Sequence, residues 1–167
     1  MGKVDILKLI KERRSVRKFQ DKEVPMQTIK NSLEAARWAP SGLNNQPWRF
    51  MVKSKQEKDK LAQYTKFGQV VKEADKLILV FLDKKSSYNY QKDLMAIGAC
   101  IQNMLLYVHS LGLGTCWLGE ILNQAKEISR ELQLPSQLEF VAAIALGVPA
   151  GEVKLTGRRL LKDLTLV

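Results

Sequence analysis

Residues 94–119 read LMAIGACIQNMLLYVHSLGLGTCWLG, a stretch that contains no Asp, Glu, Lys or Arg. The stretch is long enough to span a bilayer. It also contains Gln102, Asn103 and His109, however, and polar groups of this kind are costly in hydrocarbon. Apolar residues lie on nearly every face of a helix drawn from about 90 to 111, which favours a helix buried on most sides. We therefore expect a buried central helix over residues 90–111 and no membrane span.

Strands are predicted on both sides of this helix. Residues 77–82 form a continuous apolar run of strand length, which is typical of a central strand. Residues 140–146 form a second apolar strand near the end of the chain. Shorter strands are expected at 48–52 and, after a glycine turn, at 115–118.

The other helices are predicted from capping residues and from the helical spacing of apolar side chains. Asp5 can cap a first helix, and Pro25 suits the start of a second helix that Pro40 ends. Ser54 opens a capping box, and Asn123 can cap a further helix. The expected ranges of these helices are 5–14, 25–39, 54–64 and 123–132.

The order of these elements is helix-helix-strand-helix-strand-helix-strand-helix-strand, which predicts an α+β or α/β protein with a sheet of about four strands. We expect one domain over residues 1–167, because 46% of the 167 residues are hydrophobic and can form one core. The chain lacks a strand–GxGxxG–helix unit, which argues against a dinucleotide-binding Rossmann domain. The tail at 154–167 mixes basic and apolar residues, and we expect it to dock on its own chain or on a partner.

The chain is basic, with 27 Lys and Arg against 17 Asp and Glu and a formal net charge of +10. Such an excess favours anionic partners, and nucleic acid, a lipid surface and a phosphorylated cofactor all qualify. A solvated lysine-rich surface explains the charge equally well. Basic helices interleaved with aromatic residues are absent from the sequence, which argues against nucleic-acid binding.

Cysteine and histidine are scarce, and Cys100, Cys116 and His109 are the residues of these types. They supply neither a CxxC pair nor the ligand set of a typical zinc site. We expect reduced thiols, no bound metal and a cytoplasmic location. The first ten residues contain no continuous apolar stretch, which argues against a secretory signal.

The first of three candidate clusters is Arg13-Arg14-Ser15-Val16-Arg17, directly after the first helix. Guanidinium groups bind a phosphate monoester through paired hydrogen bonds, and a serine hydroxyl adds another donor. Three arginines and one serine could therefore hold one phosphate. A solvated basic helix end, favoured by the helix dipole, accounts for the same residues.

The second and third clusters surround predicted turns. Residues 40–48 read PSGLNNQPW, and their amide side chains suit the edge of a ligand that alternates donors and acceptors, although a plain turn also uses Gly, Asn and Pro. Residues 112–120 read GLGTCWLGE, and glycines let a backbone approach a flat ring closely. A helix C-cap followed by a buried strand explains these residues too. Cys116 fits an inert packed thiol better than a nucleophile, because the sequence shows no partner that would activate it.

Together these clusters resemble the nitroreductase superfamily of flavoproteins. The matching strings follow the family order over nearly the whole chain and are RRSVRKF at 13–19, AARWAPS at 35–41, NNQPWRF at 44–50, GLGTCWLG at 112–119, AAIALGVP at 142–149 and RR at 158–159. One string alone is a weak signal, whereas the ordered set is specific. The resemblance implies an α+β, three-layer fold with a central, mostly antiparallel sheet flanked by helices. It also implies an intertwined homodimer that binds FMN at two interface sites.

The resemblance assigns three groups of residues to the cofactor. The group on the phosphate, ribityl and N1–O2 side comprises Arg13, Ser15 and Arg17, and Arg14 belongs to the same cofactor-binding motif. A late basic pair, Arg158 and Arg159, reaches the phosphate. The group that reaches the flavin from the partner subunit comprises Pro40, Ser41, Asn44 and Gln46. The stretch that faces the flavin ring and its N5 atom comprises Leu118 and Gly119.

The resemblance further implies an oxidoreductase with NADH or NADPH as the electron donor. Hydride would pass to flavin N5 in one half-reaction and on to a small acceptor, such as a nitroaromatic or a quinone, in the other. Because the cofactor carries the chemistry, we expect no catalytic side chain, and Glu120 is assigned a structural or rim position. The short polar stretch between residues 82 and 90 lacks the helices that roof the acceptor pocket in larger members, so we expect an open pocket.

Three alternatives remain at the level of sequence. A family member of different chemistry, such as reductive dehalogenation or flavin fragmentation, would share the cofactor site. A non-enzymatic flavin-binding or redox-sensing module would bind FMN without turning over NADH or NADPH. A basic nucleic-acid-binding protein would not bind FMN.

Overall fold

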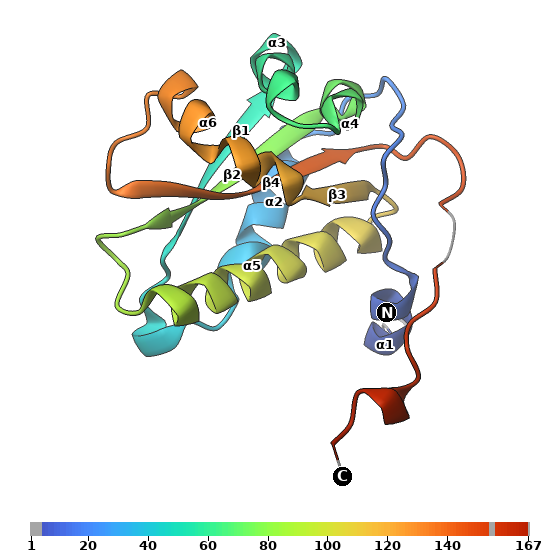
Figure 1. Cartoon of the computed structure of the whole chain (residues 1–167). Coiled ribbons are helices and arrows are strands. Elements are labelled where there is room, and N and C mark those ends of the chain that lie inside the picture. Colours follow the sequence, from blue (N-terminus) through green and yellow to red (C-terminus); the bar gives the residue numbers. More distant parts are fainter. Residues whose placement is uncertain (1–4, 154–155, 167) are drawn as a thin grey trace.

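Two antiparallel strands at the centre of one sheet organise the molecule. The computed structural model describes residues 5–153 and 156–166, and it contains a four-stranded sheet in the order β1-β2-β4-β3 with antiparallel neighbours (Figure 1). The strands are β1 (Trp48–Ser54), β2 (Lys76–Asp83), β3 (Gly114–Leu118) and β4 (Leu138–Gly147). Every residue of β2 is buried, which confirms the central strand predicted from the apolar run at 77–82.

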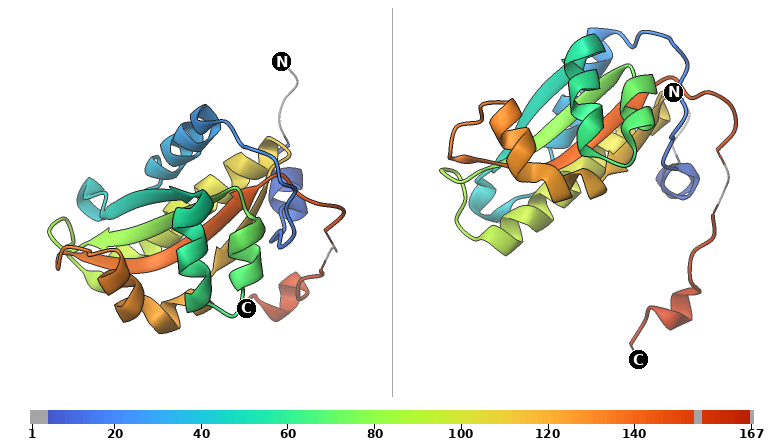
Figure 2. Two further views of the ribbon diagram at one scale, coloured as in Figure 1. Left: turned by 90° about the horizontal axis from the view of Figure 1, so that it is seen from above. Right: turned by 45° about the horizontal axis from the view of Figure 1, so that its top comes forward.

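Helices pack on both faces of this sheet, which gives three layers (Figures 1 and 2). One face is covered by α2 and α5, and the other by α3, α4 and α6. The α-helices are α1 (Ile6–Glu12), α2 (Met26–Arg37), α3 (Lys55–Asp59), α4 (Gly68–Glu73), α5 (Tyr90–Ser110) and α6 (Ala125–Glu131). The short 3₁₀ helices are η1 (Gly42–Asn44), η2 (Lys60–Tyr64), η3 (Glu120–Gln124) and η4 (Leu161–Asp163). The predicted α+β, three-layer fold is confirmed.

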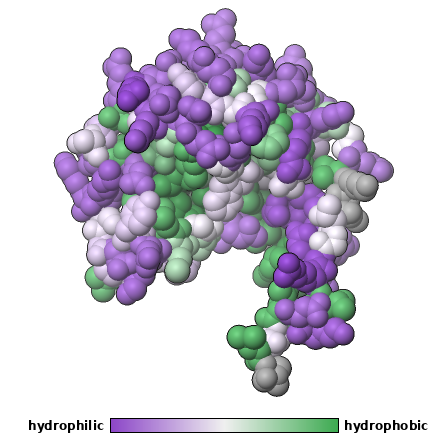
Figure 3. All heavy atoms as spheres, in the orientation of Figure 1, coloured by the Kyte–Doolittle hydropathy of each residue, from purple (hydrophilic) through white to green (hydrophobic). Residues whose placement is uncertain are grey.

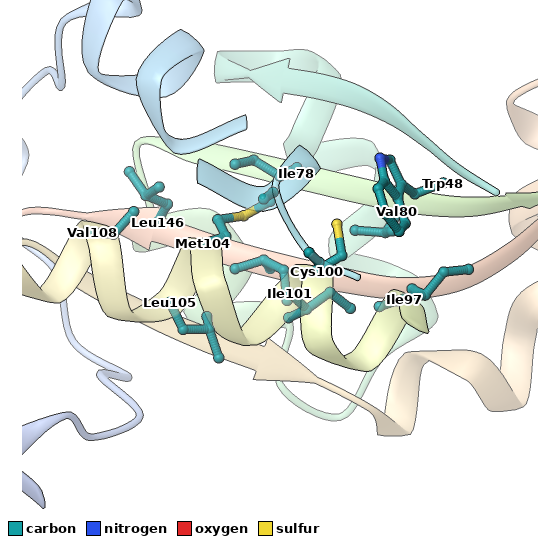
Figure 4. Close-up of a cluster of buried hydrophobic side chains, with 14 of the residues drawn as sticks. Trp48, Ile78, Val80, Ile97, Cys100, Ile101, Met104, Leu105, Val108 and Leu146 are labelled. Carbon is teal, nitrogen blue, oxygen red and sulfur yellow. The ribbon is translucent and has the colours of Figure 1, made fainter. Parts of the chain in front are cut away.

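Side chains alternate along β2, so each face of the sheet has its own hydrophobic core. Ile78 and Val80 pack in the core that includes Met104 of α5 (Figure 4). Leu79 and Phe81 point to the opposite core, which contains residues of α4 and α6. Burial on both faces explains why the sequence of β2 is continuously apolar rather than alternating.

α5 is the predicted central helix, and its sheet-facing side is buried. Its other side is only partly covered within one chain, because Met95 is 74% exposed and Leu94 and Gly98 are half-buried. The expectation of burial on most sides is therefore only partly met. The Asn89 side chain caps the helix by accepting a hydrogen bond from the backbone N–H of Lys92 at 3.1 Å. Among the described residues, no helix is long and apolar enough to cross a membrane.

The predicted caps have mixed outcomes. Asp5 caps α1 as expected, because its carboxylate accepts a hydrogen bond from a backbone N–H of the first turn at 3.0 Å. The capping box at Ser54 is wrong, since the Ser54 side chain makes no capping hydrogen bond and Lys55 adopts a left-handed φ of 49°. Asn123 is also not a cap, because it lies within η3 and α6 begins after it. α4 was not predicted.

The C-terminal segment over residues 156–166 is exposed throughout and extends away from the sheet (Figure 1). The expected docking of the tail therefore does not occur on its own chain, and a partner surface is the remaining alternative. Lys154, Leu155 and Val167 of this tail, and residues 1–4 at the other end, lie outside the described residues.

The segment that follows α1 runs between the edge strand β3 and the chain after β4. The backbone N–H of Val16 donates to the carbonyl of Thr115 at 2.9 Å, and that of Gln20 donates to the carbonyl of Val148 at 2.9 Å. Val16 is buried against Gly114, where a Cβ atom would lie 2.8 Å from the Val16 side chain. Gly114 is therefore required by the close approach of Val16.

Gly114→Ala should destabilise the fold because the added methyl overlaps Val16. Overpacking of this kind costs about 1–3 kcal/mol, which urea unfolding monitored by circular dichroism would measure. The same substitution in a Val16→Ala background should cost much less, because the smaller side chain leaves room. An undiminished cost in that background would show that Val16 is not the reason for the glycine.

Candidate functional site

A cation-lined cavity lies beside the segment that follows α1. Its volume is about 440 Å³, and its walls come from residues 13–18 and from the chain after β4. The lining residues are Arg13, Arg14, Ser15, Val16, Arg17, Lys18, Ala150, Glu152, Val153, Thr156 and Arg158. Five of them are cationic and one is acidic, so we name this site the arginine cavity.

The positive charge of the arginine cavity is poorly compensated. Burial lowers the pKa of Arg13, and the nearby cations Arg158 and Arg14 lower it further. Among the residues that the structure describes, Arg13, Arg17 and Arg158 form no ion pair with a carboxylate. Cations that repel one another at a partly buried position attract an anion, and a phosphate monoester supplies close to two negative charges.

Arg14 serves the backbone as well as the cavity. Its Nη1 atom donates to the backbone carbonyls of Lys11 and Arg13, the latter at 2.7 Å, and so closes the last turn of α1. Its Nε atom is buried without a hydrogen-bond partner. Arg14 therefore has one buried donor without a partner, next to the arginine cavity.

The two arginines of the late basic pair, Arg158 and Arg159, lie in different environments. Arg158 lines the arginine cavity, with its Nη1 atom donating to the carbonyl of Gly157 at 3.0 Å. Arg159 is exposed and is not among the residues that line the cavity. Within one chain, only the first arginine of the predicted pair is thus brought to Arg13 and Arg17.

The end of β3 presents its backbone rather than side chains. Leu118 is 2% exposed and its side chain belongs to the core, so only its backbone could face a ligand. Gly119 is exposed, and a Cβ atom there would meet no atom within 4 Å. The Glu120 carboxylate accepts hydrogen bonds from the Thr65 hydroxyl at 2.8 Å and the Lys66 N–H at 2.9 Å, which confirms its structural position. These bonds lower the pKa of Glu120, the Lys66 N–H first.

Cys116 lies in β3 behind the arginine cavity. It is buried, and burial raises the pKa of its thiol, although Arg17 and Arg13 oppose this effect. The thiol is therefore protonated at neutral pH. This agrees with an inert, packed cysteine.

The loop over residues 40–46 lies at the other end of α5. Its Ser41 Oγ atom accepts a hydrogen bond from the Gln46 N–H at 3.0 Å, and Pro40 and Asn44 are exposed. The loop contacts the first turn of α5, whereas Arg14 of the arginine cavity also lines a neighbouring cavity together with His109, in the last turn of that helix (Figure 1). Since α5 has 21 residues, these ends lie about 30 Å apart. The structure thus does not bring the loop to the arginine cavity of the same chain.

Sequence reasoning missed part of the arginine cavity. Lys18 follows the arginine motif directly, so its proximity could have been inferred from the string RRSVRK. Glu152 and Thr156 also line the cavity, but they lie in irregular backbone, where no periodicity indicates the direction of a side chain.

A second concave surface, which we name the α5 groove, was also not predicted. It has a volume of about 410 Å³ between α5 and the ends of β3 and β4, and it appears as a hydrophobic area above α5 in Figure 3. Its lining residues are Tyr90, Leu94, Ile97, Gly98, Ile101, Trp117, Leu122, Ala125, Glu139, Phe140 and Val141. The C-terminal segment carries further exposed apolar side chains, which are Leu160, Leu161, Leu164 and Leu166.

Comparison with known proteins places this geometry in a family. A profile described as the Nitroreductase family matches residues 10–77 and 64–148. A Methanothermobacter thermautotrophicus protein provisionally named NADH dehydrogenase/NAD(P)H nitroreductase is 35% identical over 153 residues, covering 90% of this chain and 80% of that protein. The iodotyrosine deiodinase of Thermotoga neapolitana is 27% identical over 170 residues, covering 84% of this chain and 87% of that protein.

A solved structure also has a similar sequence and the same fold. The crystal structure of a provisionally named nitroreductase from Desulfovibrio desulfuricans, in complex with FMN, is 46% identical with a TM-score of 0.95. The match covers 99% of this chain and 98% of that chain. The matched profile covers most of the chain, and the relatives have similar sequences and the same fold. The chain therefore belongs to the nitroreductase family.

Proposed function

We propose that the protein is an FMN-dependent oxidoreductase that passes reducing equivalents from NADH or NADPH to a small acceptor, such as a nitroaromatic or a quinone. The observation that carries the proposal is the uncompensated positive charge of the arginine cavity at the start of β3. The relatives support the same activity through their names, and the Desulfovibrio desulfuricans structure supports the cofactor.

The spacing along β3 suits an extended phosphorylated ligand. Ser15 pairs with Thr115 at the arginine end of the strand, and Leu118 lies three residues further along. At about 3.3 Å per residue, the two positions are about 10 Å apart. A phosphate in the arginine cavity could therefore be joined through a five-carbon ribityl chain to a ring beside Gly119.

In this arrangement the side chains bind and orient the ligand. Arg13, Arg17 and Arg158 would hold the phosphate, and the Ser15 hydroxyl would donate to it. The backbone around Gly119 would face N5 of the ring, because this glycine leaves open space. FMN, when bound, supplies the capacity to accept and release hydride. The buried Cys116 is unavailable as a nucleophile.

The complete site requires a second copy of the chain. The loop over residues 40–46 lies about one α5 length, or about 30 Å, from the arginine cavity of its own chain. A homodimer would supply that loop to the flavin of the other copy. The α5 groove and the exposed leucines of the C-terminal segment support such an assembly, because apolar surfaces of this kind mark protein interfaces.

A second candidate activity is reductive dehalogenation. It is favoured by one observation, the 27% identity to the iodotyrosine deiodinase of Thermotoga neapolitana. The relative with 35% identity instead supports NAD(P)H-dependent nitro reduction, which we therefore prefer.

The purified protein should release about one FMN per chain on heating and should oxidise NADH or NADPH with a nitroaromatic or quinone acceptor. Initial rates should give parallel lines in double-reciprocal plots, since donor and acceptor would use one pocket in turn. Halogenated phenols serve as competing acceptors in the same assay. FMN binding without turnover of any acceptor would indicate a flavin-binding module, and a colourless protein that rejects FMN would contradict the proposal.

Arg17→Ala and Arg158→Ala should each weaken FMN binding while leaving the fold intact. Charge-assisted hydrogen bonds contribute about 1.5–3 kcal/mol, so we expect the Kd for FMN to rise about 10- to 100-fold. Fluorescence quenching of FMN measures this Kd. Arg130→Ala is the matched control, because Arg130 is exposed on α6 and distant from the cavity lining. Parental affinity in both cavity variants would remove the phosphate assignment.

Replacement of Leu161 and Leu164 by serine should weaken dimerisation, because both side chains are exposed and would be buried only against a partner. Sedimentation velocity should show a shift toward monomer, accompanied by loss of FMN. Met26→Ser, at an exposed apolar residue on α2, is the control and should remain dimeric. If the double variant stays a dimer, the C-terminal segment does not contribute to the interface.

A further inference from the structure

The loop over residues 40–46 has a strained backbone. Leu43, Asn44 and Gln46 have φ values of 55°, 52° and 46°, in the left-handed region. For Leu43 and Gln46 this conformation costs about 1–2 kcal/mol each, whereas asparagine adopts it more readily. Burial of these side chains does not offset the cost, because Leu43 is 86% exposed and Asn44 and Gln46 are exposed. Hydrogen bonds within the loop, such as the one from the Gln46 N–H to Ser41 Oγ, offset part of this cost, and interactions with neighbouring elements add to them.

The strongest of these interactions comes from Asp93, in the first turn of α5. Asp93 is fully buried, and its Oδ1 atom accepts a hydrogen bond from the Asn45 Nδ2 atom at 2.8 Å. Its Oδ2 atom accepts from the Ser87 hydroxyl at 2.6 Å and from the backbone N–H groups of Tyr88 and Asn89 at 3.0 and 3.2 Å. Four donors thus converge on one carboxylate.

The electrostatics of Asp93 agree with this geometry. Burial raises the pKa of Asp93, but the hydrogen bonds from Ser87, Asn45, Asn89 and Tyr88 outweigh burial, so the net pKa lies below its ordinary value. Asp93 is also negatively charged at the positive end of the α5 dipole. It is therefore ionised at neutral pH and acts only as an acceptor.

Two further contacts fix the loop against the same region. Asn45 Nδ2 also donates to the carbonyl of Ser86 at 2.9 Å, while its Oδ1 atom is buried without a partner, so only its donor atom holds it. Gly42 packs against Tyr88 so closely that a Cβ atom would overlap the Tyr88 ring. Asp93 binds the N–H of Tyr88 as well, and it thereby positions both surfaces that the loop contacts.

We propose that Asp93 is a positioning residue for the FMN site of the partner copy, because it holds Asn45 and fixes the left-handed backbone that presents Ser41, Asn44 and Gln46. The inference rests on the proposed function, in which those side chains meet the flavin. A carboxylate is required because all of its neighbours are donors. An asparagine at position 93 would turn its own amide donor toward one of them.

The test uses FMN titration of the full-length protein. Asp93→Asn should raise the Kd for FMN about tenfold, the effect of one charge-assisted hydrogen bond. Asn45→Ala removes the donor but leaves the other bonds of Asp93, so it should raise the Kd similarly while the thermal unfolding of the FMN-free protein stays near parental. This second variant gives the answer if Asp93→Asn does not fold. Asp75→Asn, a carboxylate that binds the N–H of Val24 elsewhere, is the control and should retain FMN affinity.

A double-mutant cycle separates positioning from general stability. Asn45→Ala should raise the Kd less in an Asn44→Ala background than in the parent, because the loop then has less contact with FMN to lose. Additive effects, or parental affinity in both Asn45→Ala and Asp93→Asn, would overturn the inference while the proposed function stands. Failure of the parent to bind FMN would overturn the proposed function and this inference with it.

Discussion

The backbone pairing of residues 15–20 with β3 and with the chain after β4 determines where the arginines of the motif at 13–17 can lie. Val16 is anchored by a backbone hydrogen bond to Thr115 and by packing on Gly114. Because neighbouring side chains of an extended segment point in opposite directions, burial of Val16 turns Ser15 and Arg17 away from the core. Gly114 thus allows Val16 to pack on β3, and this packing directs Arg17 toward the arginine cavity.

Local charge, rather than net charge, distinguishes this site. The net charge of +10 is compatible with several classes of partner. Some lysines are buried and form ion pairs or hydrogen bonds within the protein. Lys58 is buried with its Nζ atom bound to Asp59 and to a backbone carbonyl, and Lys76 is buried beside Asp75. Among the described residues, Arg13, Arg17 and Arg158 form no ion pair with a carboxylate, and burial together with the neighbouring cations Arg158 and Arg14 lowers the pKa of Arg13. The concentration of these cations around one cavity favours an anionic ligand more than the net charge does.

The sequence predicts the elements whose burial is extensive and fails where backbone geometry decides. β2 and α5 were predicted because their apolar patterns are long. α4 was missed because a helix of six residues is shorter than the window in which periodicity can be recognised. The cap at Ser54 failed because Lys55 adopts a left-handed conformation that composition does not reveal. The arginine motif identified one wall of the cavity, whereas the split of Arg158 from Arg159 depends on irregular backbone.

If the two halves of the proposed site come from different copies of the chain, as we propose, FMN binding and association are linked. A ligand that binds only the dimer stabilises it by mass action, and the apparent FMN affinity then depends on protein concentration. α5 lies between the two halves, since the Asp93 network is at its first turn and His109, in its last turn, lines a cavity next to the arginine cavity together with Arg14. In the proposed dimer, each copy would therefore use α5 to set the distance between the phosphate that it binds and the loop that it contributes to the other copy. A change in the length or register of α5 would alter both flavin sites at once.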